Sequence, residues 1–270
     1  MDEALALHTA ARRYCLERDA FWRDRYEEIT RRGDRERDGY HYTPEALNTF
    51  PRYNLLNAIR VELERIHPDT LGVFEDTKTR LTLVGQTAED DFTQRPIGTI
   101  DQQAIADERE AFCLYIGNLS PSDVSEIDPL PYRRVLATEE SSWLRSRLNE
   151  RWQVSADYWY PLSECSLPGI VAFEDRAFSE AVSPDCLRAI LGRRGIARVW
   201  ELREYGPEYE EDVSLFAPYY NGAEGYWSSG DLDWIVYASH EQSVTVGGWL
   251  LEEVKAVWSS WQDQIWTGQF

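Results

Sequence analysis

Residues 232–238, with the sequence Leu-Asp-Trp-Ile-Val-Tyr-Ala, form a nearly uninterrupted apolar run. A short run of this kind is typical of a strand that is covered on both faces of its sheet. After a polar turn, Val244, Thr245 and Val246 predict a second strand. We therefore expect a hairpin at the centre of a sheet, followed by a helix over residues 249–261.

The segments before this hairpin extend the predicted sheet. Residues 196–204 alternate between apolar and charged side chains, which predicts a strand with one face in the core. Ser183 followed by Pro184 is typical of a helix N-cap and first turn, so we expect a helix to begin there. Further expected elements are strands at residues 158–160 and 169–173 and a helix at residues 141–152.

The first half of the chain has helical periodicity. The expected helices are residues 4–30, 50–66, 71–89 and 102–115, of which the third is also compatible with a strand. Thr49 or Asn48 can cap the second helix, because Pro51 then falls in its first turn.

Together these elements predict an α+β fold, in which a helical N-terminal half packs on a small mixed sheet with flanking helices in the C-terminal half. We expect a helical region at residues 1–117, a linker-like loop at residues 118–131 and a Trp-rich α/β region at residues 132–270. The loop assignment depends on three prolines within 14 residues. The alternative is one continuous domain.

The charge of the chain limits its partners. Among 270 residues, 48 are acidic and 28 are basic, which gives a formal net charge of −20. Such a field repels nucleic acid and anionic membranes and attracts basic proteins. No apolar stretch is long enough to span a membrane, and no secretory signal is evident, so we expect a cytoplasmic protein. Arginine greatly outnumbers lysine, which favours a GC-rich bacterial source.

The cysteines and histidines do not predict a metal site or a cofactor. Cys15, Cys113, Cys165 and Cys186 are far apart in the sequence, and the four histidines are scattered. Zinc sites and redox pairs need closer spacing, so we expect ordinary reduced thiols and no bound metal or cofactor.

A small group of residues beside the central strand could carry acid–base chemistry. Ser239, His240 and Glu241 have the side chains of a hydrolase triad, but neighbouring residues of a strand point to opposite faces. His240 could still act as a general base, with Glu241, Asp231 and Asp233 as the nearby carboxylates.

Residues 205–233 combine carboxylates with aromatic rings and contain several glycines and prolines, so we expect much of this stretch to be loop. Tyrosine and tryptophan dominate binding surfaces, and carboxylates steer basic partners. The expected partner-binding residues are Glu208, Glu210, Glu211, Asp212, Tyr219, Tyr220, Tyr226 and Trp227. Alternatively, the rings complete the core and the acids lie on the surface.

The sequence favours a non-catalytic acidic protein that binds a basic protein partner. Its profile is similar to that of many bacterial immunity and antitoxin-like proteins, which implies neutralisation of a basic toxin. The first alternative is a hydrolase-like enzyme that acts on a polar small molecule or a sugar through His240. The second is an assembly subunit with an apolar patch at Trp258, Trp261 and Trp266.

Overall fold

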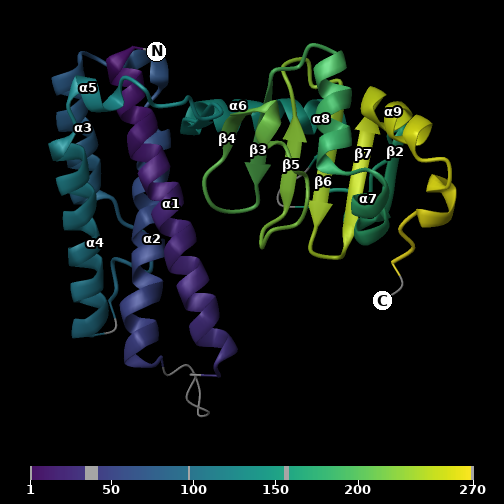
Figure 1. The fold of residues 1–270 in the computed structure, drawn as a ribbon. Helices are drawn as coiled ribbons and strands as arrows, with labels where there is room; N and C mark the ends of the chain where they lie inside the picture. Colours follow the sequence, from purple (N-terminus) through teal and green to yellow (C-terminus); the bar gives the residue numbers. More distant parts are fainter. Residues whose placement is uncertain (1, 34–41, 97, 155–157, 269–270) are drawn as a thin grey trace. The chain divides into compact units, whose positions relative to one another are not determined.

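The structure is a computed structural model that describes residues 2–33, 42–96, 98–154 and 158–268. The chain divides into two compact units, Met1–Leu130 and Pro131–Phe270. The first unit is helical and the second contains a sheet with helices, which confirms the α+β class (Figure 1). How the helical half packs on the sheet stays a prediction.

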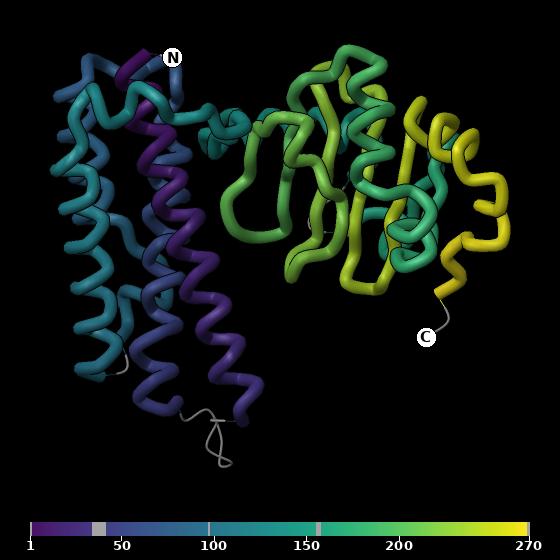
Figure 2. Tube along the Cα trace, in the orientation of Figure 1, coloured from purple at the N-terminus to yellow at the C-terminus, as the bar shows by residue number. Residues whose placement is uncertain are grey.

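The first unit is a bundle of long helices that lie side by side (Figure 2). Its helices are α1 (Glu3–Arg31), α2 (Pro44–Glu64), α3 (Phe74–Thr87), α4 (Thr99–Asn118) and the short α5 (Pro121–Val124). Their apolar faces share one core, in which Leu7, Leu55, Ile59 and Phe112 are fully buried. The helical alternative for residues 71–89 is therefore correct.

The second helix begins earlier than the sequence indicated. The side chain of Thr43 caps it by accepting a hydrogen bond from the Ala46 N–H, and Pro44 occupies the first turn. A cap residue followed by a proline thus occurs at two places in the sequence, at Thr43 with Pro44 and at Thr49 with Pro51. The helix begins at the first of these, so the expected start at the second is wrong. Pro51 lies inside α2, where its ring removes one backbone donor.

The segment 118–131 is more than a linker-like loop. It contains α5, which contacts α1, and Val124 is fully buried in the helical core. Pro121 therefore begins a helical turn, whereas Pro129 and Pro131 lie in an exposed, irregular stretch at the boundary between the two units.

Two buried carboxylates connect the helices of the first unit. Glu108 on α4 has no exposed surface, and it accepts two hydrogen bonds of 2.7 Å from Arg18 and one of 3.0 Å from the Trp22 indole. Arg52 approaches the same carboxylate at 3.4 Å. Glu64 pairs in a similar way with Arg12 at 3.1 Å. These ion pairs fix how α1, α2 and α4 align, because misalignment would leave charges unpaired in the interior.

In the described residues of the second unit, seven strands form one sheet in the order β1-β4-β3-β5-β6-β7-β2. The strands are β1 (Arg133–Val135), β2 (Ile170–Glu174), β3 (Arg198–Arg203), β4 (Tyr209–Asp212), β5 (Gly225–Ser228), β6 (Trp234–Ser239) and β7 (Ser243–Gly248). Every pairing is antiparallel, so the expectation of a mixed sheet is wrong. Hairpins link β3 to β4, β5 to β6 and β6 to β7, whereas the connections that contain α6, α7 and α8 join strands that are not neighbours, so none of the described helices imposes a parallel pair.

The central strand β6 is covered on both faces, as its apolar run predicts. Trp234, Val236 and Ala238 point to one core, and Ile235 and Tyr237 point to the other. Burying a side chain of this size contributes about 1.5–3 kcal/mol, so β6 is a main source of the unit's stability. The helices on the first face are α7 (Asp175–Ala181), α8 (Pro184–Arg193) and α9 (Trp249–Val257), and α6 (Thr138–Trp152) covers the second face (Figure 1).

Some strands of the sheet were not predicted from the sequence. The stretch 205–233 contains β4 and β5, and β5 lies between β3 and β6 near the middle of the sheet. Gly225 and the flanking glycines and serines concealed it, because these residues weaken a strand pattern. Residues 158–160 do not form the expected strand, since Tyr160 begins a turn.

The glycines between β7 and α9 are required by packing. Gly248 has φ +76°, and a Cβ on it would lie 2.1 Å from the Asp233 carbonyl oxygen. Only glycine avoids both the backbone strain and the overlap at this turn. The backbone conformation and packing of this turn therefore require glycine at position 248.

Candidate functional site

Three neighbouring strands of the second unit, β3, β5 and β6, each have one terminus at the same end of the sheet. The antiparallel register pairs Arg203 with Gly225, and Gly225 with Ala238. The residues just beyond these pairs therefore lie together at this end of the sheet, and they include Glu204, Glu224 and His240. The sequence alone does not reveal this grouping, because Glu204 and His240 are 36 positions apart in the chain.

The imidazole of His240 is held by a buried carboxylate. Glu224 is completely buried, and its Oε1 accepts hydrogen bonds from the His240 backbone N–H at 3.0 Å and from the imidazole Nδ1. The hydrogen bond to Glu224 raises the pKa of His240, and burial of the ring opposes this shift. The protonated imidazole is thus favoured at a pH where a free histidine is largely neutral.

Two further carboxylates lie around this pair. An oxygen of Glu241 is 3.2 Å from Nε2 of His240, and Glu204 lies close enough for its charge to raise the pKa of His240 as well. Glu204 also accepts a long hydrogen bond, 3.5 Å, from the backbone N–H of Glu224. Three carboxylates thus surround one imidazole, and the local potential is negative even when His240 is protonated.

The second oxygen of Glu224 faces the interior. It has no hydrogen-bond partner by geometry among the described residues, and neither has the neighbouring Tyr237 hydroxyl. Burial and the nearby Glu224 carboxylate raise the pKa of Tyr237, so this phenol stays protonated. A protonated Tyr237 is a potential donor for Glu224, which helps to keep the buried carboxylate in place.

Two tyrosines flank His240 on the outside, and a third lies beside one of them. The ring of Tyr158 lies 6.0 Å from the imidazole and that of Tyr220 lies 6.4 Å from it. The hydroxyl of Tyr205 donates a hydrogen bond to the Gly222 carbonyl, which connects β3 to the loop that carries Tyr220. Exposed fractions are 41% for Tyr158, 59% for Tyr205 and 38% for Tyr220. We call the surface formed by Tyr158, Tyr205, Tyr220, His240 and Glu241 the tyrosine face.

Comparisons of the chain with protein-family models, with curated proteins and with solved structures found no match. The site must therefore be interpreted from its own geometry. In the part of the chain that the structure describes, no group of three or more histidine, cysteine or acidic side chains is placed to hold a metal ion. None of the described helices combines the length and the apolar character needed to cross a membrane.

The structure separates the candidate acid–base residues into two sites. His240 and Glu241 follow β6, whereas Asp231 and Asp233 precede it. The six residues of β6 at about 3.3 Å each place the two groups roughly 20 Å apart. Asp233 instead accepts a hydrogen bond of 2.9 Å from the Trp249 indole, and Asp231 is exposed. Asp231 and Asp233 therefore cannot act together with His240, and the expectation that they would is wrong.

Two of the expected partner-binding rings lie in the core. Tyr226 is 1% exposed and Trp227 is 3% exposed, because they are on opposite faces of the central strand β5. Tyr226 stacks on Tyr237 with the ring centres 4.8 Å apart, and Trp227 contacts Phe216. These two rings stabilise the sheet and are not available to a partner.

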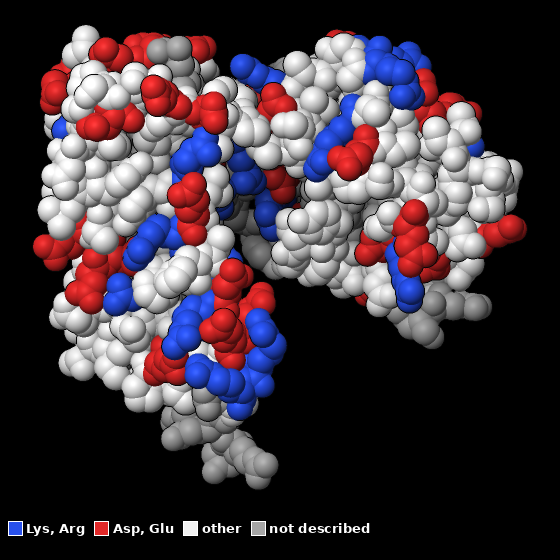
Figure 3. Space-filling model, in the orientation of Figure 1, with Lys and Arg blue, Asp and Glu red and all other residues white. Residues whose placement is uncertain are grey.

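The expected partner-binding acids are paired within the chain. Glu208 accepts hydrogen bonds from Arg145 and Ser141, Glu210 pairs with Arg134 at 3.0 Å, and Glu211 lies 3.3 Å from Arg133. Asp212 accepts a hydrogen bond of 2.8 Å from the Ser214 N–H and caps a short 3₁₀ helix. Figure 3 shows basic side chains next to many acidic ones on the visible faces of both units. The acid-rich segment 208–212 is thus structural.

The remaining expected residues, Tyr219 and Tyr220, are both exposed. Of these two, Tyr220 is the one with a ring contact to His240. Glu204, Glu224, Tyr158 and Tyr205 were not predicted as site residues. A correct prediction of the β5–β6 hairpin would have shown that Glu224 and His240 are neighbours across two strands.

The C-terminal tryptophans do not form an exposed apolar patch. Trp258 is buried and contacts Phe173, and Trp261 packs against the same core. The Trp266 indole donates a hydrogen bond of 3.0 Å to the Glu241 carbonyl. The structure therefore gives no support to self-assembly through Trp258, Trp261 and Trp266.

Proposed function

We propose that the tyrosine face binds a cationic segment of a protein partner. The observation that carries this proposal is the pair of exposed tyrosines, Tyr158 and Tyr220, that flank His240, with exposed Tyr205 beside Tyr220, at a place where the carboxylates outnumber the imidazole. An arginine or lysine side chain can lie over a tyrosine ring and pair with a carboxylate at the same time. Rigid aromatic rings also contribute binding area at a low cost in side-chain entropy.

The charge of the whole chain supports the same type of partner. A net charge of −20 attracts basic proteins over a distance of about one Debye length, and it opposes binding to nucleic acid. The tyrosine face then provides the contacts that a uniform negative surface lacks. A cytoplasmic, immunity-like protein that neutralises a basic toxin is a biological role of this kind, and it is part of the proposal.

The proposal differs from the sequence-based expectation in the residues that bind. Carboxylates paired with arginine inside the fold contribute little attraction to an external cation, because their charge is already compensated. The binding residues are therefore those of the tyrosine face, and the segment 208–212 serves to pair β4 with β1 and β3 in the sheet.

A nona-arginine peptide is a suitable probe for this face. The double variant Tyr205→Ala/Tyr220→Ala is expected to weaken peptide binding about tenfold or more, since each ring–cation contact contributes about 0.5–2 kcal/mol. Isothermal titration calorimetry at several salt concentrations measures the affinity. For the unaltered chain it should decrease as salt is added.

Matched variants separate this face from general electrostatics. Trp143 is an exposed ring of α6, and Trp143→Ala should leave peptide affinity unchanged. Glu241→Gln should weaken binding more than Glu252→Gln on α9, although both remove one negative charge. Equal losses in these pairs would show that the peptide responds only to the net charge, and the tyrosine face would have no special role.

The pair of Glu224 and His240 favours a second function, acid–base catalysis on a polar small molecule or sugar. A buried carboxylate that orients an imidazole is the arrangement used by many general bases. If this function holds, the chain should hydrolyse members of a panel of p-nitrophenyl glycosides and esters, and His240→Asn should lower the rate about 100-fold or more. An unchanged rate in His240→Asn would exclude His240 as the acid or base.

A further inference from the structure

A second concave site lies beside α6, next to the tyrosine face. It is an open pocket of about 610 Å³, which is within the range of pockets that hold small molecules. Its apolar wall is formed by the buried side chains of Leu148, Val154, Leu202 and Tyr226. Polar side chains from α6 and the end of β3 complete the lining, and they are Arg145, Ser146, Asn149, Glu150 and Glu204.

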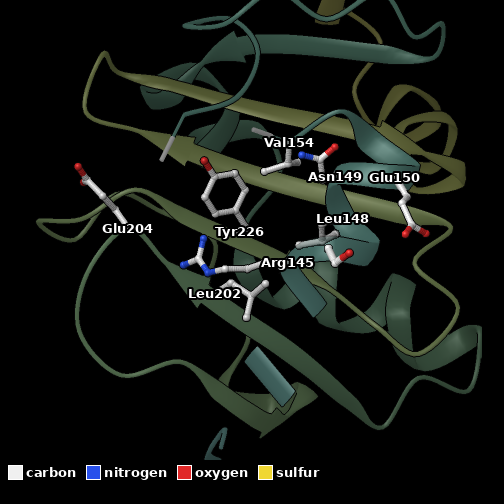
Figure 4. Close-up of a pocket in the computed structure, with 9 residues that line it drawn as sticks. Arg145, Leu148, Asn149, Glu150, Val154, Leu202, Glu204 and Tyr226 are labelled. Carbon is white, nitrogen blue, oxygen red and sulfur yellow. The ribbon is translucent and has the colours of Figure 1, made fainter. Parts of the chain in front are cut away.

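The charges around this pocket are compensated except at one end. Arg145 is already paired with Glu208 and also donates to the Arg203 carbonyl, and Glu150 pairs with Arg147 at 2.6 Å. Glu204 is half-buried and has no arginine, lysine or histidine within ion-pair distance among the described residues. Figure 4 shows Glu204 at one side of the pocket and Glu150 at the other, with Tyr226 and Arg145 between them.

Glu204 lies beside a second carboxylate, and this makes a positively charged ligand more favourable at this end of the pocket. The adjacent Glu224 is fully buried, and its carboxylate has only the imidazole of His240 as a charged partner within ion-pair distance among the described residues. A half-buried carboxylate beside a second carboxylate is stabilised when a cation displaces the water around it.

We infer that the pocket is a binding site for a small organic cation, with an amine or guanidine group at Glu204 and a compact apolar body against Leu148, Leu202 and Tyr226. This site uses none of the five residues of the tyrosine face, although Glu204 also lies near His240, and it does not depend on the protein-binding role of that face. Ser146 and Asn149 provide hydrogen-bonding groups at the exposed rim for polar substituents of the ligand.

Three probes of the same size test the inference: benzylamine, benzyl alcohol and benzoate. Each is titrated into the full chain labelled with ¹⁵N, and the amide shifts of Leu202, Glu204 and Asn149 are followed. Benzylamine is expected to bind about tenfold or more tightly than the other two, because its ammonium forms a charge-assisted pair with Glu204. Failure of benzylamine to bind, or benzoate binding of equal strength, would overturn the inference.

Variants locate the site and separate it from the tyrosine face. Glu204→Gln should remove the preference for benzylamine over benzyl alcohol, and Ser146→Trp should block all three probes by filling the pocket. Ser142→Trp is the matched control, because a helical side chain leans towards the N-terminus and Ser142 lies one turn before the pocket. A preference that persists in Glu204→Gln would contradict the assigned orientation.

The same variants test whether the pocket and the tyrosine face are independent binding sites. Ser146→Trp should leave nona-arginine binding unchanged, and Tyr220→Ala should leave benzylamine binding unchanged. If Tyr220→Ala abolishes benzylamine binding, the amine lies on the tyrosine face and the separate pocket site is refuted.

Discussion

Replacement of Glu108 by glutamine is expected to destabilise the helical unit by about 3–5 kcal/mol, as found when one partner of a buried ion pair is removed. The carboxylate is completely buried and accepts hydrogen bonds from Arg18, Arg52 and the Trp22 indole. Glutamine preserves the volume but removes the charge. Two guanidinium groups then lose their shared partner, and Arg52 is only 10% exposed.

Hydrogen exchange of the full chain, measured by mass spectrometry, gives this loss separately for each unit. Peptides from α1, α2 and α4 should lose protection in Glu108→Gln, whereas peptides from β5 and β6 should keep it. Glu110→Gln is the matched control, since Glu110 is exposed on the same helix and its loss should cost less than about 0.5 kcal/mol. A similar small effect for Glu108→Gln would show that the buried cluster does not hold the helices together.

Acidification from pH 6.5 to pH 4 is expected to cost the helical unit about 3 kcal/mol through His8 alone. His8 is buried between α1 and α2, where Nε2 donates a hydrogen bond of 2.9 Å to the Leu63 carbonyl. Burial lowers the pKa of His8 to about 4, and the positive charge of Arg12 contributes to the same shift. Between these pH values the unfolded chain binds a proton at His8 more readily than the folded chain does, so stability is lost as the pH decreases.

The variant His8→Gln isolates this effect from the titration of carboxylates. The glutamine amide can donate to Leu63 but does not titrate, so the stability of the natural chain relative to His8→Gln should decrease as the pH falls. Urea unfolding followed by far-UV circular dichroism at several pH values measures the difference. His67→Gln serves as the control, and a difference that is independent of pH would contradict the role given to His8.

The main elements of the fold were predictable because they have strong local patterns. The apolar run of β6, the alternation of β3 and the long periodic helices each carry their own signal. The short strand β5 does not, because glycine and serine flank its two aromatic residues. Its position follows from pairing with β3 and β6, which is information that the local sequence does not contain.

The candidate site was only partly predictable for the same reason. His240 and Glu241 were identified from their place after β6, and Tyr220 from its place in a glycine-rich loop. Glu224 and Glu204 became site residues only when the antiparallel register brought three strand ends together. Conversely, the acidic segment 208–212 suggested a binding surface, but arginines distant in sequence, such as Arg134 and Arg145, compensate its charge.

The most direct test of the tyrosine face is to map where a cationic peptide binds. The full chain labelled with ¹⁵N is titrated with nona-arginine, and amide and histidine side-chain shifts are recorded together. We expect saturable changes at Tyr158, Tyr205, Tyr220 and His240 that are larger than those at the acidic residues 208–212. Changes spread evenly over exposed acids of both units, with none concentrated at His240, would contradict this expectation.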